Sequence, residues 1–88
     1  MLKQNEIAVI KKLAKKYKLK SVFLFGSSVE EDTYNDIDLA IEGIKSGLFF
    51  NLYGELFKYL SKPVDLVDLK HKTAFNKLII ENGLKIYG

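Results

Sequence analysis

The chain has 88 residues, the size of one domain, and 48% of them are hydrophobic, as in an ordinary globular protein. It contains no cysteine, which excludes a disulfide framework and any thiolate metal site. No apolar run is long enough to span a membrane or to form the core of a signal peptide. We therefore expect residues 1–88 to form a single domain with a cytoplasmic location.

The net charge of +3 comes from fourteen lysines and no arginine. Six lysines crowd one short stretch, namely Lys11, Lys12, Lys15, Lys16, Lys18 and Lys20. Such a cluster is typical of the solvated outer face of an amphipathic helix. Because no aromatic residues are interleaved as a base-stacking surface requires, nucleic acid ranks last among the partners that we consider.

The apolar spacing predicts three helices and three strands in the order helix, strand, strand, helix, strand, helix. The predicted helices cover residues 5–17, 48–60 and 73–81, and the predicted strands cover residues 21–25, 36–41 and 64–69. Residues 27–35 are polar and are expected to form at most a helical turn and a loop. Residues 84–87 are long enough for a short extended segment.

The lengths of the connections predict how the strands run. The second and third strands are joined by more than twenty residues that contain a helix, which is typical of a parallel βαβ unit. The first two strands are joined by eight residues after Ser27, too few for a parallel crossover, so they are expected to be antiparallel. The predicted fold class is α/β (α+β), with a small mixed three-stranded sheet and helices packed on it.

Three aspartates are expected to converge at one edge of this sheet. Asp36 and Asp38 are two residues apart on a strand and so share one face, while Asp65 opens the neighbouring parallel strand. Asp68 lies three residues after Asp65 and faces the other way. Carboxylates without histidine or cysteine suit Mg²⁺ or Mn²⁺ better than zinc. The alternative is that Asp36 belongs to a turn and Asp38 is a tolerated polar residue on an edge strand.

A Gly-Ser pair ends the first strand next to the expected carboxylates. Gly26 lets a phosphate approach the backbone, and Ser27 offers a hydroxyl and a free N–H group. The alternative is a helix cap without any ligand, because Ser27 and Glu30 match the capping pattern. His71, the only histidine, follows the third strand in a loop and is not expected to be catalytic.

Taken together, these motifs resemble the DNA polymerase β-type nucleotidyltransferase superfamily, and most closely its minimal single-domain members, the MNT proteins. The pattern is a hydrophobic strand, Gly-Ser, Asp-x-Asp on a second strand and a third aspartate on a later strand. Here these residues are Gly26, Ser27, Asp36, Asp38 and Asp65, and the match spans nearly the whole chain.

The resemblance implies a Mg²⁺-dependent transfer of AMP from ATP to a hydroxyl group, with release of pyrophosphate. Asp36 and Asp38 would bridge two Mg²⁺ ions, Asp65 would hold the second ion and accept the proton, and Gly26 and Ser27 would bind phosphates. The chain departs from the family pattern in two respects. The connection after Ser27 is short and acidic, and no arginine is available to clamp a phosphate with two parallel hydrogen bonds.

The resemblance also implies a partner, since minimal proteins of this kind usually accompany a helical HEPN toxin and adenylylate one of its tyrosines. The helix expected over residues 48–60 carries apolar residues around about twice the arc of a core-facing stripe, which favours contact with another chain. The alternative for this helix is complete burial within the domain. The alternative function is a non-catalytic antitoxin that neutralises its partner by binding alone.

Overall fold

The computed structural model describes residues 2–26 and 35–88 of the chain. Their elements are α1 (Gln4–Lys16), β1 (Ser21–Phe25), β2 (Ile37–Glu42), α3 (Phe49–Tyr59), β3 (Val64–Asp68), α4 (Ala74–Asn82) and β4 (Leu84–Tyr87). Each predicted helix and strand is present, and each end lies within one residue of its predicted position. In the described part of the chain, no helix has both the length and the apolar character needed to cross a membrane.

The strands form one sheet in the order β3-β2-β1-β4. β1 pairs with β2 in antiparallel orientation, and β2 pairs with β3 in parallel orientation, which confirms both predictions from connection length. The sheet has four strands rather than the three expected, because β4 joins the free side of β1. That additional pairing supplies partners for backbone groups of β1, whose residues Ser21 to Leu24 are all buried.

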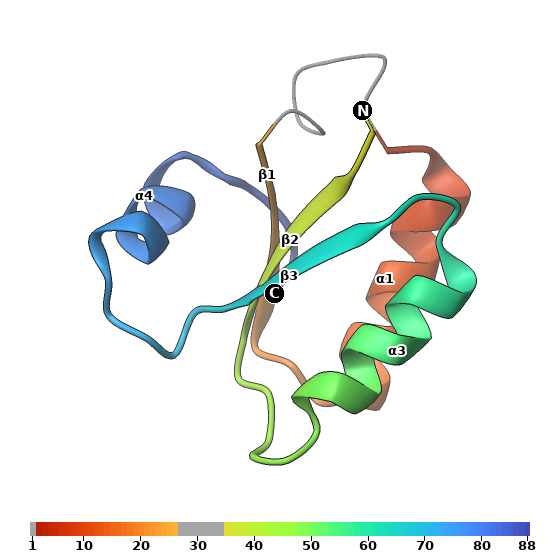
Figure 1. Ribbon diagram of the computed structural model, residues 1–88, viewed down its shortest axis with the longest axis horizontal. Helices are drawn as coiled ribbons and strands as arrows, with labels where there is room; N and C mark the ends of the chain where they lie inside the picture. Colours follow the sequence, from red (N-terminus) through yellow and green to blue (C-terminus); the bar gives the residue numbers. More distant parts are fainter. Residues whose placement is uncertain (1, 27–34) are drawn as a thin grey trace.

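Helices cover the two faces of the sheet unequally (Figure 1). α1 and α3 lie side by side on one face, and of the helices in the described residues only α4 lies on the other. The larger core lies on the α1 and α3 side and includes Ile37, Leu39 and Ile41 from alternating positions of β2. A smaller cluster on the opposite side comprises Phe23, Ala40, Leu69 and Ile79, with Phe25 and Val67 packed against it.

The lysine-rich segment lies on the outside of the domain, because all six of its lysines are exposed. Lys16 and Tyr17 both donate hydrogen bonds to the carboxylate of Glu55, with 2.7 Å between Lys16 Nζ and Glu55 Oε1. These bonds join α1 to α3, and the bond from Lys16 is the main cause of a lowered pKa of Glu55. The cluster is thus a solvated helix face with one interhelical contact.

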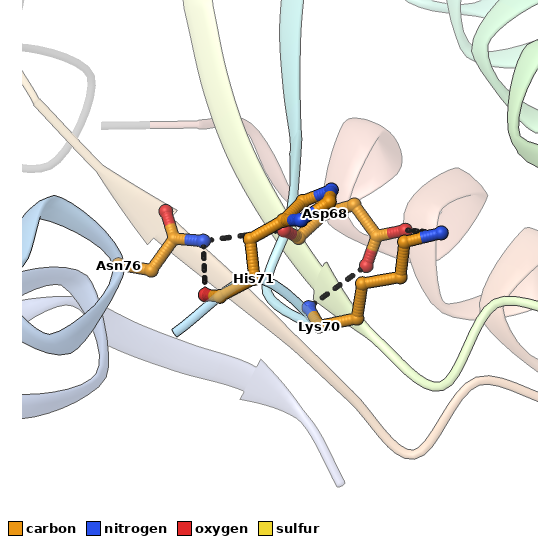
Figure 2. Close-up of polar contacts among 4 residues, drawn as sticks. All are labelled: Asp68, Lys70, His71 and Asn76. Carbon is orange, nitrogen blue, oxygen red and sulfur yellow. Dashed lines mark hydrogen bonds and ion pairs between the residues drawn. The ribbon is translucent and has the colours of Figure 1, made fainter. Parts of the chain in front are cut away.

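A buried asparagine fixes the turn that carries the chain from β3 into α4 (Figure 2). The Asn76 side-chain amide donates to the backbone carbonyls of His71, at 2.8 Å, and Asp68, at 3.2 Å. Its own backbone N–H donates to the hydroxyl of Thr73, which caps the helix. Asp68 completes the turn by accepting from the backbone N–H of Lys70 at 3.0 Å. The position of α4 over the sheet therefore depends on Asn76.

We expect Asn76→Ala to lower the free energy of unfolding by about 1–3 kcal/mol, because two backbone carbonyls lose a donor whose bonds to them are partly buried. In a domain of this size each kcal/mol corresponds to about 4–8 °C in Tm, measurable by circular dichroism. His71→Ala is the control, because it keeps the backbone carbonyl that accepts from Asn76. An equal loss of Tm in both variants would contradict the role of the amide.

Candidate active site

The strand register places two of the predicted carboxylates on neighbouring strands at the same level. Asp38 on β2 lies opposite Asp65 on β3, and on its other side Asp38 lies opposite Phe25 of β1. β2 is an interior strand of the sheet, so the interpretation of Asp38 as a tolerated polar residue on an edge strand is wrong. The two strands, far apart in sequence, thus bring two acidic side chains together.

Asp38 belongs to the face of the sheet that α4 covers. Ile37 and Leu39, its neighbours in the chain, are fully buried in the core beneath α1 and α3. Because side chains alternate along a strand, Asp38 and Ala40 point to the opposite face. Asp36 lies in the bend just before β2 and is exposed, so the strand itself begins one residue after it.

Gly26 closes the site from the end of β1. Its φ of +72° lies in the left-handed region, which glycine adopts without the steric penalty of a side chain. A Cβ atom at this position would lie 2.3 Å from Asp38 Oδ2. Any side chain larger than hydrogen would therefore displace the Asp38 carboxylate, which explains why glycine is needed beside this aspartate.

The carboxylates interact unfavourably with one another. Burial raises the pKa of Asp38 above its usual range, and the negative charges of Asp65 and Asp36 raise this pKa further. A side-chain hydrogen bond with Asp65 acts in the same direction. A raised pKa of this origin means that the site favours a positive charge, whether a proton or a metal ion.

The remaining predicted residues have different positions. No set of three or more Asp, Glu, His or Cys side chains in the described residues already forms a metal-binding cluster, so ligation by all three aspartates requires a side-chain rearrangement. Ser27 lies outside the described residues. Asp68 lies opposite Ile41, away from Asp38, and His71 is an exposed turn residue.

Sequence reasoning missed an open surface hollow of about 470 Å³, lined mainly by apolar side chains, that begins at Gly26 and continues along α4. Its wall includes Phe25, Phe75 and Leu78. The sequence did contain a signal, because Phe75 and Leu78 are large apolar residues three positions apart on one helix. In the structure Ile79 is the one apolar residue of α4 that is buried. The cavity and the carboxylates share Gly26.

The family of the chain follows from comparison with known families. The family model described as Polymerase beta, Nucleotidyltransferase matches residues 8–88. The chain therefore belongs to the polymerase beta nucleotidyltransferase family, in agreement with the resemblance based on Gly26, Ser27 and the three aspartates. A comparison with curated protein sequences found no match.

Solved structures with the same fold come from toxin-antitoxin complexes. A chain of the MntA-HepT complex has 27% identity and a TM-score of 0.75 over 98% of this chain and 73% of its own length. A toxin-antitoxin structure with AMP-PNP gives 28% and 0.74 over 99% and 74%. A complex of the tri-AMPylated Shewanella oneidensis HEPN toxin with its MNT antitoxin gives 29% and 0.76 over 99% and 73%.

We expect Asp38→Asn to raise the Tm near neutral pH by about 2–4 °C, which corresponds to relief of about 0.5 kcal/mol of repulsion and desolvation. A carboxyl pKa that is higher in the folded state destabilises the fold at pH values above it. This penalty disappears as the pH falls below the unfolded pKa. The Tm difference between variant and wild type should therefore shrink as the pH falls toward the ordinary carboxyl range.

Glu81→Gln is the matched control, because it removes one negative charge from an exposed position on α4. Differential scanning calorimetry of the three proteins across pH 3–8 would measure both effects. A Tm for Asp38→Asn that is lower than that of the wild type at neutral pH would contradict the repulsive environment.

Proposed function

We propose that this chain is a Mg²⁺-dependent adenylyltransferase that moves AMP from ATP to a hydroxyl group, a tyrosine side chain, of a HEPN toxin and thereby acts as its antitoxin. The observation that carries the proposal is the register that places Asp38 between Asp65 and the Gly26 end of β1. In this arrangement the carboxylates of Asp38 and Asp65 lie next to Gly26, where the lack of a side chain would let a phosphate approach the backbone.

The residues present fit a hard divalent cation. Asp36 and Asp38 would hold two Mg²⁺ ions and Asp65 the second of them, because all donors are carboxylate oxygens and the pKa of Asp38 is raised by burial and by its acidic neighbours. When bound, the ions supply positive charge that stabilises the triphosphate and acidifies the attacking hydroxyl group. Gly26 keeps the space beside Asp38 free of side-chain atoms.

The proposed reaction is a single displacement at the α-phosphorus of ATP. The tyrosine oxygen forms a bond to the α-phosphorus as the bond from phosphorus to the α,β-bridging oxygen breaks, and pyrophosphate leaves with that electron pair. The tyrosine proton passes to the carboxylate of Asp65, which lies exposed on the edge strand where a partner side chain can reach it. Ser27 is proposed to bind the leaving phosphates together with the Gly26 turn.

The similar complexes support a nucleotide and a HEPN partner for this chain. One of them contains AMP-PNP, and another contains a HEPN toxin that carries three AMP groups beside an MNT antitoxin. This chain has the same fold over almost its whole length, at 28% and 29% identity. These likenesses favour adenylylation of a partner over transfer to a small molecule.

The outer face of α3 supports contact with a partner protein. Leu52 and Leu56 are buried, whereas Phe50 and Phe57 remain 80% and 55% exposed. These two exposed rings lie two turns apart on the same side of the helix, and Gly54 lies between them. A Cβ on Gly54 would meet nothing within 4 Å, so packing within the described chain does not explain a glycine there. A glycine in this position allows close approach of a helix from the partner.

A transfer assay tests the proposal directly. With [α-³²P]ATP and Mg²⁺, we expect the wild-type chain to label a co-purified HEPN partner, and substitution of its acceptor tyrosine to remove the label. Asp36→Ala and Asp38→Ala should each lower the rate by about 100-fold or more, the order of loss expected when a charge-stabilising group is removed. Circular dichroism should show a retained fold, and Glu81→Gln should transfer at the wild-type rate.

The second candidate is an antitoxin that binds without catalysis. It is favoured by the lack of a preformed three-carboxylate cluster in the described residues and by the absence of arginine from the sequence. Isothermal titration calorimetry separates the two candidates. Partner binding without any heat or thermal shift from ATP and Mg²⁺ would refute the transferase and establish the binding module.

Either function predicts that α3 contributes to partner affinity. We expect Phe50→Asp to weaken binding of the HEPN partner by about 10-fold or more, because a charge replaces an apolar ring at the interface. Asn51→Asp is the control, since it places the same charge at an exposed position of α3 about 100° away. Surface plasmon resonance measures both, and equal affinities for the two variants would exclude the Phe50 face from the interface.

A further inference from the structure

β3 forms one edge of the sheet in the described residues. It is the first strand of the order β3-β2-β1-β4 and pairs with β2 alone. The backbone N–H of Ile37 donates to the carbonyl of Pro63, and the N–H of Leu69 donates to the carbonyl of Ile41. Backbone groups of successive residues in a strand point to alternate sides. The odd-numbered positions from 63 to 69 therefore face β2, and positions 64, 66 and 68 face the free edge.

Two of the outward carbonyls have side-chain partners, and Leu66 lies between them. The carbonyl of Val64 accepts from the hydroxyl of Tyr53 at 2.6 Å, and the carbonyl of Asp68 accepts from the amide of Asn76 at 3.2 Å. No strand of the described chain pairs with the outward N–H and carbonyl groups of Leu66. An additional strand could pair with both groups.

β3 lacks the features that usually protect an edge strand from pairing. Its five residues, Val64–Asp68, contain no lysine and no proline, and its register with β2 is continuous. Its charged residues have other roles, because Asp65 belongs to the candidate site and Asp68 accepts a hydrogen bond from Lys70. The opposite edge strand, β4, has only four residues, carries Lys85 and shifts in register against β1. Short length, lysine and bulges commonly protect an edge, so β3 is the edge that can accept another strand.

The free edge of β3 lies between the two surfaces that the proposed function uses. Tyr53, which binds the outward carbonyl of Val64, also has its ring centroid 6.4 Å from that of Phe57 on α3. Asp65, the proposed proton acceptor, is exposed on the same strand. Because opposite residues of neighbouring strands point to the same face, a strand added to β3 would place one side chain beside Asp65.

The geometry points to β3 as the docking edge for an extended segment of the partner protein, and this segment carries the acceptor tyrosine. The inference rests on the proposed transferase function and specifies how that function holds its protein substrate. Backbone pairing at Leu66 gives affinity, and the register of the added strand sets the tyrosine opposite Asp65. Contacts of the partner with the rings of α3 continue along the same side of the domain.

Amide hydrogen exchange of the ¹⁵N-labelled chain, alone and with the co-purified HEPN partner, tests the pairing without requiring catalysis. We expect the Leu66 amide to exchange about 10-fold more slowly or less in the complex, because it gains a backbone acceptor. The Val67 amide is the control, since it faces β2 and should exchange slowly in both samples. Unchanged exchange at Leu66 in the complex would overturn the proposal. So would slow exchange at Leu66 in the chain alone, which would mean that a second copy occupies the edge.

A pair of substitutions separates the backbone group from the side chain. Leu66→Pro removes the outward N–H, and Leu66→Ala is the matched control because it shortens the side chain and keeps the N–H. Proline is tolerated in an edge strand where the N–H faces away from the neighbouring strand. We expect Leu66→Pro to bind the partner about 3- to 10-fold more weakly than Leu66→Ala, with a matching rise in the KM for the partner. Both variants should bind ATP with Mg²⁺ as the wild type does.

The possible outcomes separate the two hypotheses. Wild-type chain that transfers no AMP to the partner refutes the transferase and, with it, the delivery of a tyrosine by an added strand. Wild-type transfer combined with equal partner affinities for Leu66→Pro and Leu66→Ala refutes the docking edge alone. Circular dichroism verifies that both variants fold, and if Leu66→Pro does not, the exchange of the Leu66 amide in the wild-type complex decides.

Discussion

The parallel pairing of β2 with β3 is the interaction on which the rest of the site depends. It sets Asp38 beside Asp65, and its register is fixed on the opposite face, where Ile37 pairs with Val64 and both are buried. A slip of β3 by one residue would turn Val64 toward α4 and Asp65 into the core. The hydrophobic effect on one face of the sheet therefore positions the charges on the other.

The same arrangement gives the site features that lower the stability of the folded domain. Burial and two neighbouring negative charges raise the pKa of Asp38, and Gly26 beside it adopts a left-handed conformation. Neither feature stabilises the isolated chain. Both are explained if the site is built to receive positive charge and a phosphate, since sites adapted to bind a ligand commonly reduce the stability of the fold that carries them.

Most of the fold could be predicted from the sequence because local patterns and chain lengths determine it. The crossover between β2 and β3 has the length and the helix of a parallel unit, and a parallel pair in register sets Asp65 next to Asp38. The pairing of β4 with β1 was not predicted, because residues 84–87 form a short segment whose partner lies about sixty residues away. The cavity at Phe75 was missed because it depends on where α4 lies, and the buried side-chain amide of Asn76, which binds two carbonyls of the preceding turn, sets that position.

The two faces of the sheet have different roles. One supplies the stable core and the other the candidate active site, which is how 88 residues combine both. α1 and α3 enclose most of the buried side chains, so that face supplies most of the folding free energy. α4 covers the other face with one fully buried apolar residue, Ile79, and leaves Phe75 and Leu78 exposed. A helix packed as tightly as α3 would fill the space beside Gly26. The sparse packing of α4 is therefore what keeps a cavity open next to the carboxylates.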